Sequence, residues 1–238
     1  MFSGGVCVRE STIGIIKTGR APGDLERQFG TFPAMIQAML GEATYRTYDA
    51  VSGALPEQPE ACDAYVITGS PAGVYDALPW IASLEAFLQR AKGRAKLVGI
   101  CFGHQIMAQA FGGTVVKSDK GLGLGLHTYE VTNPARWIDD PAPIAIAISH
   151  QDQVIVAPPE AEIVGGSEFA PIGILNYTDQ PAISFQCHPE FSPEFAAALV
   201  EHQRARVPET ADSLVASLAQ PNDRNRVAGW IRCFLDQH

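Results

Sequence analysis

The residues best suited to chemistry in this chain are a cysteine and the two glycines around it. Residues 98–105, VGICFGHQ, place Cys101 between Gly99 and Gly103, after an apolar run and before polar side chains. This spacing is typical of a nucleophile elbow, in which a tight turn between a strand and a helix exposes the side chain. The helix N-terminus would stabilise the thiolate through its dipole and its free N–H groups. The alternative is that Cys101 is a small buried side chain, the common fate of a free cysteine.

A histidine and a glutamate two positions apart form a second candidate group. They are His188 and Glu190 in the stretch FQCHPEF, residues 185–191, at the end of a strand-like run. Side-chain alternation along a strand would put both on one side and turn Cys187 away from them, into the core. The imidazole can then take a proton from Cys101 while the carboxylate fixes its tautomer. Taken alone, the pair also fits a surface contact or a hydrogen-bonded core histidine.

Acyl chemistry also requires two N–H donors near the carbonyl oxygen that becomes negative. The backbone of Phe102, directly after the cysteine, is one candidate donor. A loop with the sequence TGSPAGVYD, residues 68–76, follows another strand-like run. Because the carboxyl ends of parallel strands share one edge of a sheet, we expect this loop to bring a second amide to the site. Glycine, serine and proline are also ordinary turn residues, so the loop by itself equally fits a plain turn.

The cysteine, the His–Glu pair and the loop amide can act together only if the fold brings them to the same edge of a sheet. Strand-like and helical stretches alternate over residues 12–113, which predicts a largely parallel sheet with helices on both faces. From residue 113 to residue 188 the chain is mostly strand-like, which predicts antiparallel additions and therefore a mixed sheet. After residue 191 it is helical again and ends in an amphipathic helix. No linker or repeat interrupts this order, so we expect a single domain over residues 1–238.

Composition and charge limit the partners and the cellular location that we expect for this protein. The chain has 17 Lys and Arg against 26 Asp and Glu, a net charge of −9, and no basic cluster, so nucleic acid is not an expected partner. No apolar run approaches a membrane span and the N-terminus lacks the features of a secretory signal, so we expect a cytoplasmic protein without membrane contact. The scattered cysteines predict reduced thiols: Cys7, Cys62, Cys101, Cys187 and Cys233.

Together, the motifs GICFGHQ, CHPEF and TGSP resemble those of the class I glutamine amidotransferase family, whose triad is Cys, His and Glu. The resemblance covers nearly the whole chain. It implies a flavodoxin-like α/β fold, a three-layer sandwich with a mixed, mostly parallel central sheet and helices on both faces. It further implies that Cys101 attacks a γ-glutamyl amide to give a thioester, that His188 is the general acid and base, and that Glu190 orients His188.

The resemblance also assigns binding roles. The backbone amides of Phe102 and Ser70 match the oxyanion hole, although the family usually has glycine at the second position, and serine would resist a positive φ there. Gln105 matches a residue that holds the glutamine substrate. His150, in the stretch ISHQDQV, matches a position that lines the substrate pocket, and Gly69 is a further candidate for substrate binding. For His150, a hydrogen-bonded histidine in an ordinary turn is the alternative.

For function, the resemblance implies a cysteine-dependent hydrolase of the γ-glutamyl amide bond of glutamine or of small γ-glutamyl compounds. Stand-alone members of the GMP-synthase-like branch and the γ-glutamyl peptidases are the most similar. Two alternatives stay open: a glutaminase subunit that supplies ammonia to a separate synthetase partner, and a non-catalytic interaction or sensor protein. No metal or organic cofactor is expected, because a thiolate and amide donors suffice. Arg20 or Arg27 is a candidate partner for a substrate carboxylate.

Overall fold

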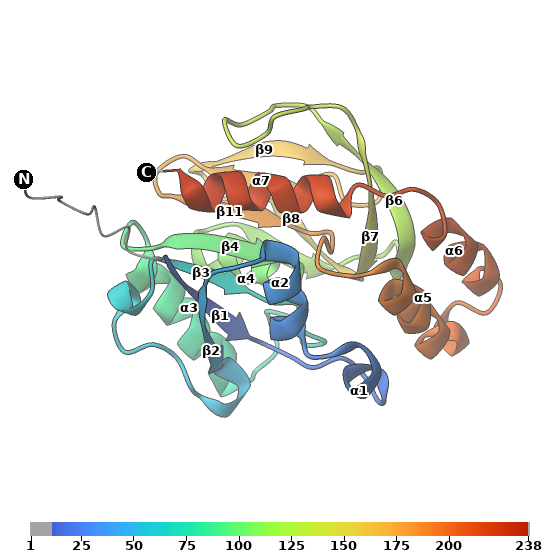
Figure 1. Cartoon of the computed structure of the whole chain (residues 1–238), viewed down its shortest axis with the longest axis horizontal. Coiled ribbons are helices and arrows are strands. Elements are labelled where there is room, and N and C mark those ends of the chain that lie inside the picture. The colour runs from blue at the N-terminus through green and yellow to red at the C-terminus, as the bar shows by residue number, and fades with distance from the viewer. Residues whose placement is uncertain (1–10, 238) are drawn as a thin grey trace, which may run out of the picture.

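A nine-stranded sheet forms the centre of the described part of the chain, residues 11–237 of a computed structural model (Figure 1). Its strand order is β2-β1-β3-β4-β11-β10-β9-β6-β7, and β5 and β8 pair in a separate small sheet. The predicted thiol of Cys7 lies outside the described residues. The strands are β1 (Thr12–Lys17), β2 (Thr44–Asp49), β3 (Ala64–Ile67), β4 (Lys96–Ile100), β5 (Thr114–Lys117), β6 (Gly123–Val131), β7 (Ile144–His150), β8 (Asp152–Val156), β9 (Ala161–Gly166), β10 (Ile174–Tyr177) and β11 (Ala182–Phe185).

The main sheet has a parallel part and an antiparallel part. β2, β1, β3, β4 and β11 pair in parallel, whereas β11, β10, β9, β6 and β7 pair antiparallel. The predicted mixed sheet is therefore confirmed. One detail of that prediction is wrong, because β5 and β8 pair with each other rather than extend the main sheet. β2 was not predicted, because its residues TYRTYD lie at the sheet edge and show no run of buried apolar side chains.

Helices cover both faces of the sheet, as predicted. α2 and α7 lie on one face and α3 and α4 on the other (Figure 1). The helices are α1 (Leu25–Phe29), α2 (Phe32–Leu40), α3 (Pro79–Ala91), α4 (Phe102–Ala110), α5 (Pro193–His202), α6 (Ala211–Leu218) and α7 (Arg224–Asp236), with short 3-10 turns η1 (Ala50–Ser52), η2 (Pro59–Ala61) and η3 (Arg204–Arg206).

The core follows from the alternation of side chains along the strands. In β1, Ile15 packs into the cluster beneath α2 and α7, while Ile16 packs into the cluster beneath α3 and α4. Because both faces are covered, the central strands are apolar throughout, and all four residues of β3 are buried. A third cluster joins α5 and α6 to Phe32 at the start of α2 and to Phe191 in the turn after β11. This cluster supports the carboxyl edge of the sheet, where the candidate site lies.

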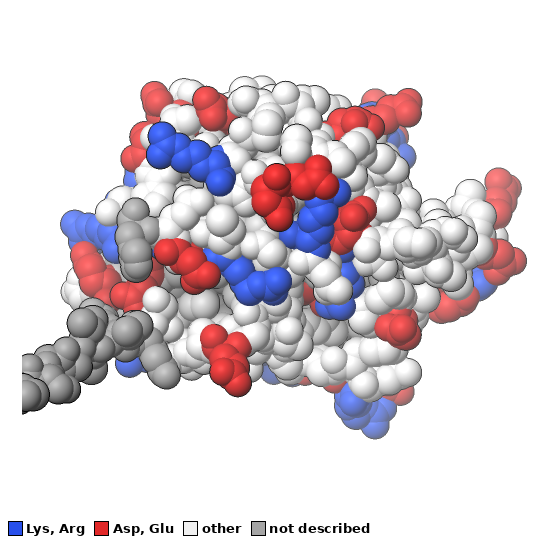
Figure 2. Space-filling view, turned by 45° about the horizontal axis from the view of Figure 1, so that its top comes forward, with Lys and Arg blue, Asp and Glu red and all other residues white. Residues whose placement is uncertain are grey.

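The surface carries both signs of charge. Figure 2 shows one face, on which basic and acidic side chains are interspersed. Within residues 11–237, no helix has the length and apolar character needed to cross a membrane. The expectations of one domain, of a cytoplasmic location, and of no nucleic-acid or membrane partner stay predictions.

Candidate active site

Cys101 occupies a tight turn between a strand and a helix. β4 ends at Ile100 and α4 begins at Phe102, so the cysteine is the single residue between them. Its backbone has φ 53° and ψ −102°, and no other non-glycine residue between 11 and 237 has a positive φ. A side chain in such a conformation costs about 1–3 kcal/mol, which the surrounding structure must offset. Backbone strain is therefore concentrated at the residue that the sequence predicts to be the nucleophile.

Gly99 and Gly103 permit this turn because neither position has room for a side chain. A Cβ on Gly99 would lie 2.5 Å from the carbonyl oxygen of Gly103. A Cβ on Gly103 would lie 2.3 Å from the carbonyl oxygen of Ile67, the last residue of β3. The first turn of α4 thus packs directly on the backbone of the sheet, which explains both glycines of the motif.

Gly103→Ala is therefore expected to destabilise the fold by about 3 kcal/mol, because α4 must move away from β3 to make room for the methyl group. Thermal unfolding should show a fall in Tm of about 6–12 °C for a chain of this size. Gly229→Ala in α7 is the matched control, since the nearest atom to its new Cβ would be 3.9 Å away. The control should gain up to about 1 kcal/mol from helix propensity. Similar Tm values for the two variants would contradict the close packing at Gly103.

His188 and Glu190 meet in the turn that follows β11. His188 Nδ1 lies 2.7 Å from Glu190 Oε1, and both side chains are buried. The imidazole also stacks on the ring of Phe191, with 3.9 Å between ring centroids. β11 ends at Phe185, so the expected strand alternation at these positions is wrong, and the turn brings the pair together instead. Cys187 is fully buried in the core, as predicted.

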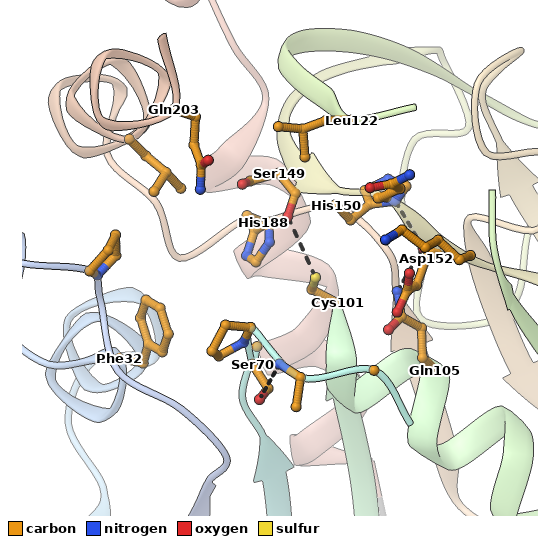
Figure 3. A pocket seen from close by; sticks show the side chains of 18 of the residues that line it. Phe32, Ser70, Cys101, Gln105, Leu122, Ser149, His150, Asp152, His188 and Gln203 are labelled. Atoms are coloured by element: carbon orange, nitrogen blue, oxygen red, sulfur yellow. Dashed lines mark hydrogen bonds between the residues drawn. The ribbon is translucent and has the colours of Figure 1, made fainter. Parts of the chain in front are cut away.

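Electrostatics at this pair favour a charged imidazole. Burial alone would lower the pKa of His188, but the negative charges of Glu190 and of the Cys101 thiolate outweigh it and raise the pKa. The ring lies beside Cys101 in Figure 3, and this neighbour contributes to the raised pKa. Cys101 Sγ is 3.9 Å from the carbonyl oxygen of Ser149. An imidazolium beside a thiolate would supply a nucleophile and a proton donor at the same place.

The loop after β3 passes close to the cysteine and the histidine. A Cβ on Gly69 would lie 3.2 Å from His188 Cε1 and 3.8 Å from Cys101 Cβ. The next residue, Ser70, does not have a positive φ, so its serine side chain causes no backbone strain. Its N–H donates to no group in the described part of the chain. Phe102 is the first residue of α4, where N–H groups lack a partner within the helix. Two backbone donors are therefore available near the sulfur.

Gln105 and His150 belong to one wall beside the cysteine. Gln105 Nε2 donates to the carbonyl oxygen of Asp152 at 2.8 Å and to Gln186 Oε1 at 3.1 Å. His150 is the last residue of β7, and its Nδ1 lies 3.1 Å from the same carbonyl oxygen of Asp152. Burial lowers the pKa of His150 to about 3, so its ring is neutral near pH 7 and donates this bond through Nδ1–H.

These residues line one cavity of about 540 Å³. Arg20 and Arg27 are the two arginines that the sequence offers as partners for a substrate carboxylate. Arg20 lines the cavity, whereas Arg27 pairs with Asp24 on the exposed surface of the first helical turn. In Figure 3, Cys101 and His188 lie between two walls, one carrying Phe32 and Gln203 and the other Gln105, His150 and Asp152.

Sequence reasoning missed several residues of this cavity. Lys117 at the end of β5 lines it, and so does Tyr75. Burial, together with the neighbouring Asp152, raises the pKa of Tyr75 to about 12. Phe191, which stacks on His188, lies within the CHPEF motif and could have been noticed there. Tyr75 belongs to the loop of residues 68–76 that was expected at the site, so its place in that loop was a signal for it. No local pattern marks Lys117, which only the fold brings to the cavity.

A strained cysteine elbow, a buried His–Glu pair and free loop amides at the carboxyl edge of a mainly parallel sheet are typical of α/β enzymes with a cysteine nucleophile. The model of the family described as glutamine amidotransferase class-I matches residues 37–203. The chain belongs to this family, and the fold and family expected from the motifs are confirmed.

Individual relatives agree with this assignment. A glutamine amidotransferase-like protein of Schizosaccharomyces pombe is 33% identical over 142 residues, covering 58% of this chain and 57% of that protein. Gamma-glutamyl peptidase 3 of Arabidopsis thaliana is 26% identical over 215 residues, covering 83% of this chain and 86% of the peptidase. A solved glutamine amidotransferase structure from Thermotoga maritima has a TM-score of 0.75 at 17% identity and covers 96% of this chain and 99% of that one. The last similarity concerns the fold alone.

Proposed function

We propose that this protein hydrolyses γ-glutamyl amide bonds with Cys101 as nucleophile. The observation that carries the proposal is the strained elbow that holds Cys101 beside His188, whose ring is in turn held by Glu190 at 2.7 Å. A thiol, a base and an orienter in this order are the parts needed for acyl transfer through a covalent intermediate. The name of the Arabidopsis relative, a gamma-glutamyl peptidase, agrees with this chemistry.

In the first half of the reaction, the Cys101 thiolate attacks the γ-carbonyl carbon and the π electrons of the carbonyl move to its oxygen. The N–H groups of Ser70 and Phe102 stabilise this oxyanion. The carbonyl re-forms as the C–N bond breaks, and His188 gives its proton to the departing amine. The products are a γ-glutamyl thioester and a neutral imidazole.

In the second half, water attacks the thioester while His188 takes a proton from it. The C–S bond breaks, glutamate leaves, and the thiolate and imidazolium are restored. Glu190 stabilises the imidazolium in both halves, because its buried carboxylate lies against His188 Nδ1. Each step uses only groups of the chain, the substrate and water.

The cavity supports a substrate larger than glutamine itself. Its volume of about 540 Å³ is within the range that encloses drug-sized ligands. Lys117 and Asp152 line it together, which suits the carboxylate and ammonium groups of a γ-glutamyl unit. The opposite wall, with Phe32 and Gln203, leaves space for an amine leaving group, and Arg20 at this cavity suits a leaving group with a carboxylate. We therefore favour small γ-glutamyl peptides over glutamine.

The test is release of glutamate by the isolated protein from glutamine and from γ-glutamyl dipeptides with aliphatic, aromatic and acidic second residues. We expect a higher kcat/KM for dipeptides than for glutamine, and no release by Cys101→Ala. Low turnover of every substrate that rises when a separate synthetase is added would favour the ammonia-supplying subunit. Equal rates for the native protein and Cys101→Ala would remove both functions that depend on Cys101, and an absence of release by either protein would favour an interaction or sensor role.

A further inference from the structure

The end of β1 lies directly behind the loop that carries Ser70. Thr18 follows β1 and Thr68 follows β3, and both side chains are 1% exposed. The N–H of Thr18 donates to Thr68 Oγ1 at 3.0 Å, so the two strand ends are joined. A Cβ on Gly19 would lie 2.8 Å from Pro71 Cδ and 3.0 Å from Ser70 Cα. The glycine thus lets the backbone after β1 pack tightly against the loop.

Two hydroxyl groups converge on the carbonyl oxygen of Gly69. Thr18 Oγ1 lies 2.9 Å and Thr68 Oγ1 3.1 Å from this oxygen. Thr18 Oγ1 also lies 2.9 Å from the carbonyl oxygen of Thr68. Both hydroxyls are buried and neither threonine lines the cavity, so the oxygen of Gly69 faces the strand ends rather than the cavity.

Peptide geometry then fixes the direction of the next N–H. In a planar trans peptide the C=O and N–H bonds point in opposite directions. With Gly69 O turned towards the threonines, the N–H of Ser70 points the other way and has no partner in the described part of the chain. The catalytic pair is close to this peptide, because His188 Cε1 lies 3.2 Å and Cys101 Cβ 3.8 Å from the Cβ position of Gly69.

We propose that Thr18 and Thr68 are positioning residues that hold the Gly69–Ser70 peptide with its N–H towards the substrate, so that the oxyanion hole exists before substrate binds. The inference rests on the proposed function, because it assigns the N–H of Ser70 to the oxyanion. A rotated peptide would instead turn the oxygen of Gly69 towards the developing negative charge and repel it. The hydroxyls prevent this rotation, because it would break both contacts with Gly69 O.

Thr18→Val tests the inference because valine keeps the shape of threonine and lacks its donor. Loss of one oxyanion donor costs about 10²–10³-fold in kcat. We expect about a 10-fold loss for Thr18→Val and about a 100-fold loss for Thr18→Val/Thr68→Val, both within that limit. KM should change little, because the N–H of Ser70 stabilises the oxyanion of the transition state rather than the bound substrate. Thr18→Ser/Thr68→Ser keeps both hydroxyls and should restore kcat to near the native value.

The alkylation rate of Cys101 distinguishes a defect in the oxyanion hole from a defect in the nucleophile. Alkylation of Cys101 by iodoacetamide needs the thiolate but no oxyanion hole, so its rate should be the same in the valine variants and the native protein. Cys233, which is exposed on α7 and does not line the cavity, gives an internal reference rate in the same mass spectrum. Native kcat in the valine double variant would overturn the inference, and so would a fall in kcat accompanied by an equal fall in Cys101 alkylation.

The crystal structure of the valine double variant tests the inference without turnover. A rotated or mixed Gly69–Ser70 peptide is expected, and an unchanged single orientation would overturn it. If the native protein releases glutamate from no substrate, the proposed function fails while this structural readout still decides whether the threonines orient the peptide. Equal Tm values for the valine and serine double variants would show that a kcat difference between them does not come from unfolding.

Discussion

Cys101→Ala is expected to lower kcat for γ-glutamyl hydrolysis by about 10⁴-fold or more, the loss typical of removing a nucleophile from a triad. The sulfur lies at the elbow beside His188, and the other described cysteines do not line the cavity. Glutamate release under substrate saturation measures the effect. Cys62→Ala is the control, since Cys62 is buried among the side chains beneath α3 and should leave kcat unchanged.

Substitutions of Cys101 that abolish activity are expected to differ in their effect on stability. Cys101 has φ 53°, and alanine keeps the strained Cβ, whereas glycine removes it. Cys101→Gly should therefore unfold with a free energy about 1 kcal/mol higher than Cys101→Ala, which corresponds to a Tm about 2–4 °C higher. If the glycine variant were no more stable than the alanine variant, the backbone at the elbow would not be strained.

His188→Asn is expected to lower kcat about as much as Cys101→Ala, because triad members act as a unit. Glu190→Gln should cost at least about tenfold less, since an orienter can be partly replaced by water. The loss arises because the introduced amide can present its NH₂ group to His188 Nδ1, which disfavours the tautomer whose Nε2 accepts a proton. Steady-state kinetics of both variants on one dipeptide would measure the order of effects. A larger loss for Glu190→Gln than for His188→Asn would contradict the assigned roles.

The pH profile gives an independent check on this pair. Burial lowers the pKa of His188, and the charges of Glu190 and Cys101 raise it above its ordinary value by a larger amount. The imidazolium is therefore kept as pH rises and is lost only when pH passes this raised pKa. Glu190→Gln removes one of the two charges, so the alkaline limb of kcat/KM should move to lower pH. His150, with a pKa of about 3, stays neutral over the measurable range and should not contribute to that limb. An unmoved limb would show that Glu190 does not set the charge of His188.

Local patterns were enough to predict the layers of the fold and the candidate nucleophile. Apolar strands and amphipathic helices alternate in the chain because buried parallel strands need helices on both faces, and the structure has that arrangement. The Gly-x-Cys-x-Gly spacing indicated the elbow because part of the steric demand is local: a Cβ on Gly99 would meet the carbonyl oxygen of Gly103 in the same turn, whereas the need for glycine at position 103 comes from Ile67 on β3. β2 was not found because an edge strand carries little of the buried apolar pattern on which such predictions rest.

The sequence by itself therefore determined which residue types occur at the ends of which strands, and with them the family. Only the tertiary structure decided how these ends meet. It placed His188 and Glu190 in a turn instead of on a strand, excluded a positive φ at Ser70, and brought Thr18 behind the peptide of Gly69. The contacts of Thr18 with Thr68 and Gly69 join residues about 50 positions apart. No local preference encodes them, because they depend on the pairing of β1 with β3 and on close backbone packing at the shared edge.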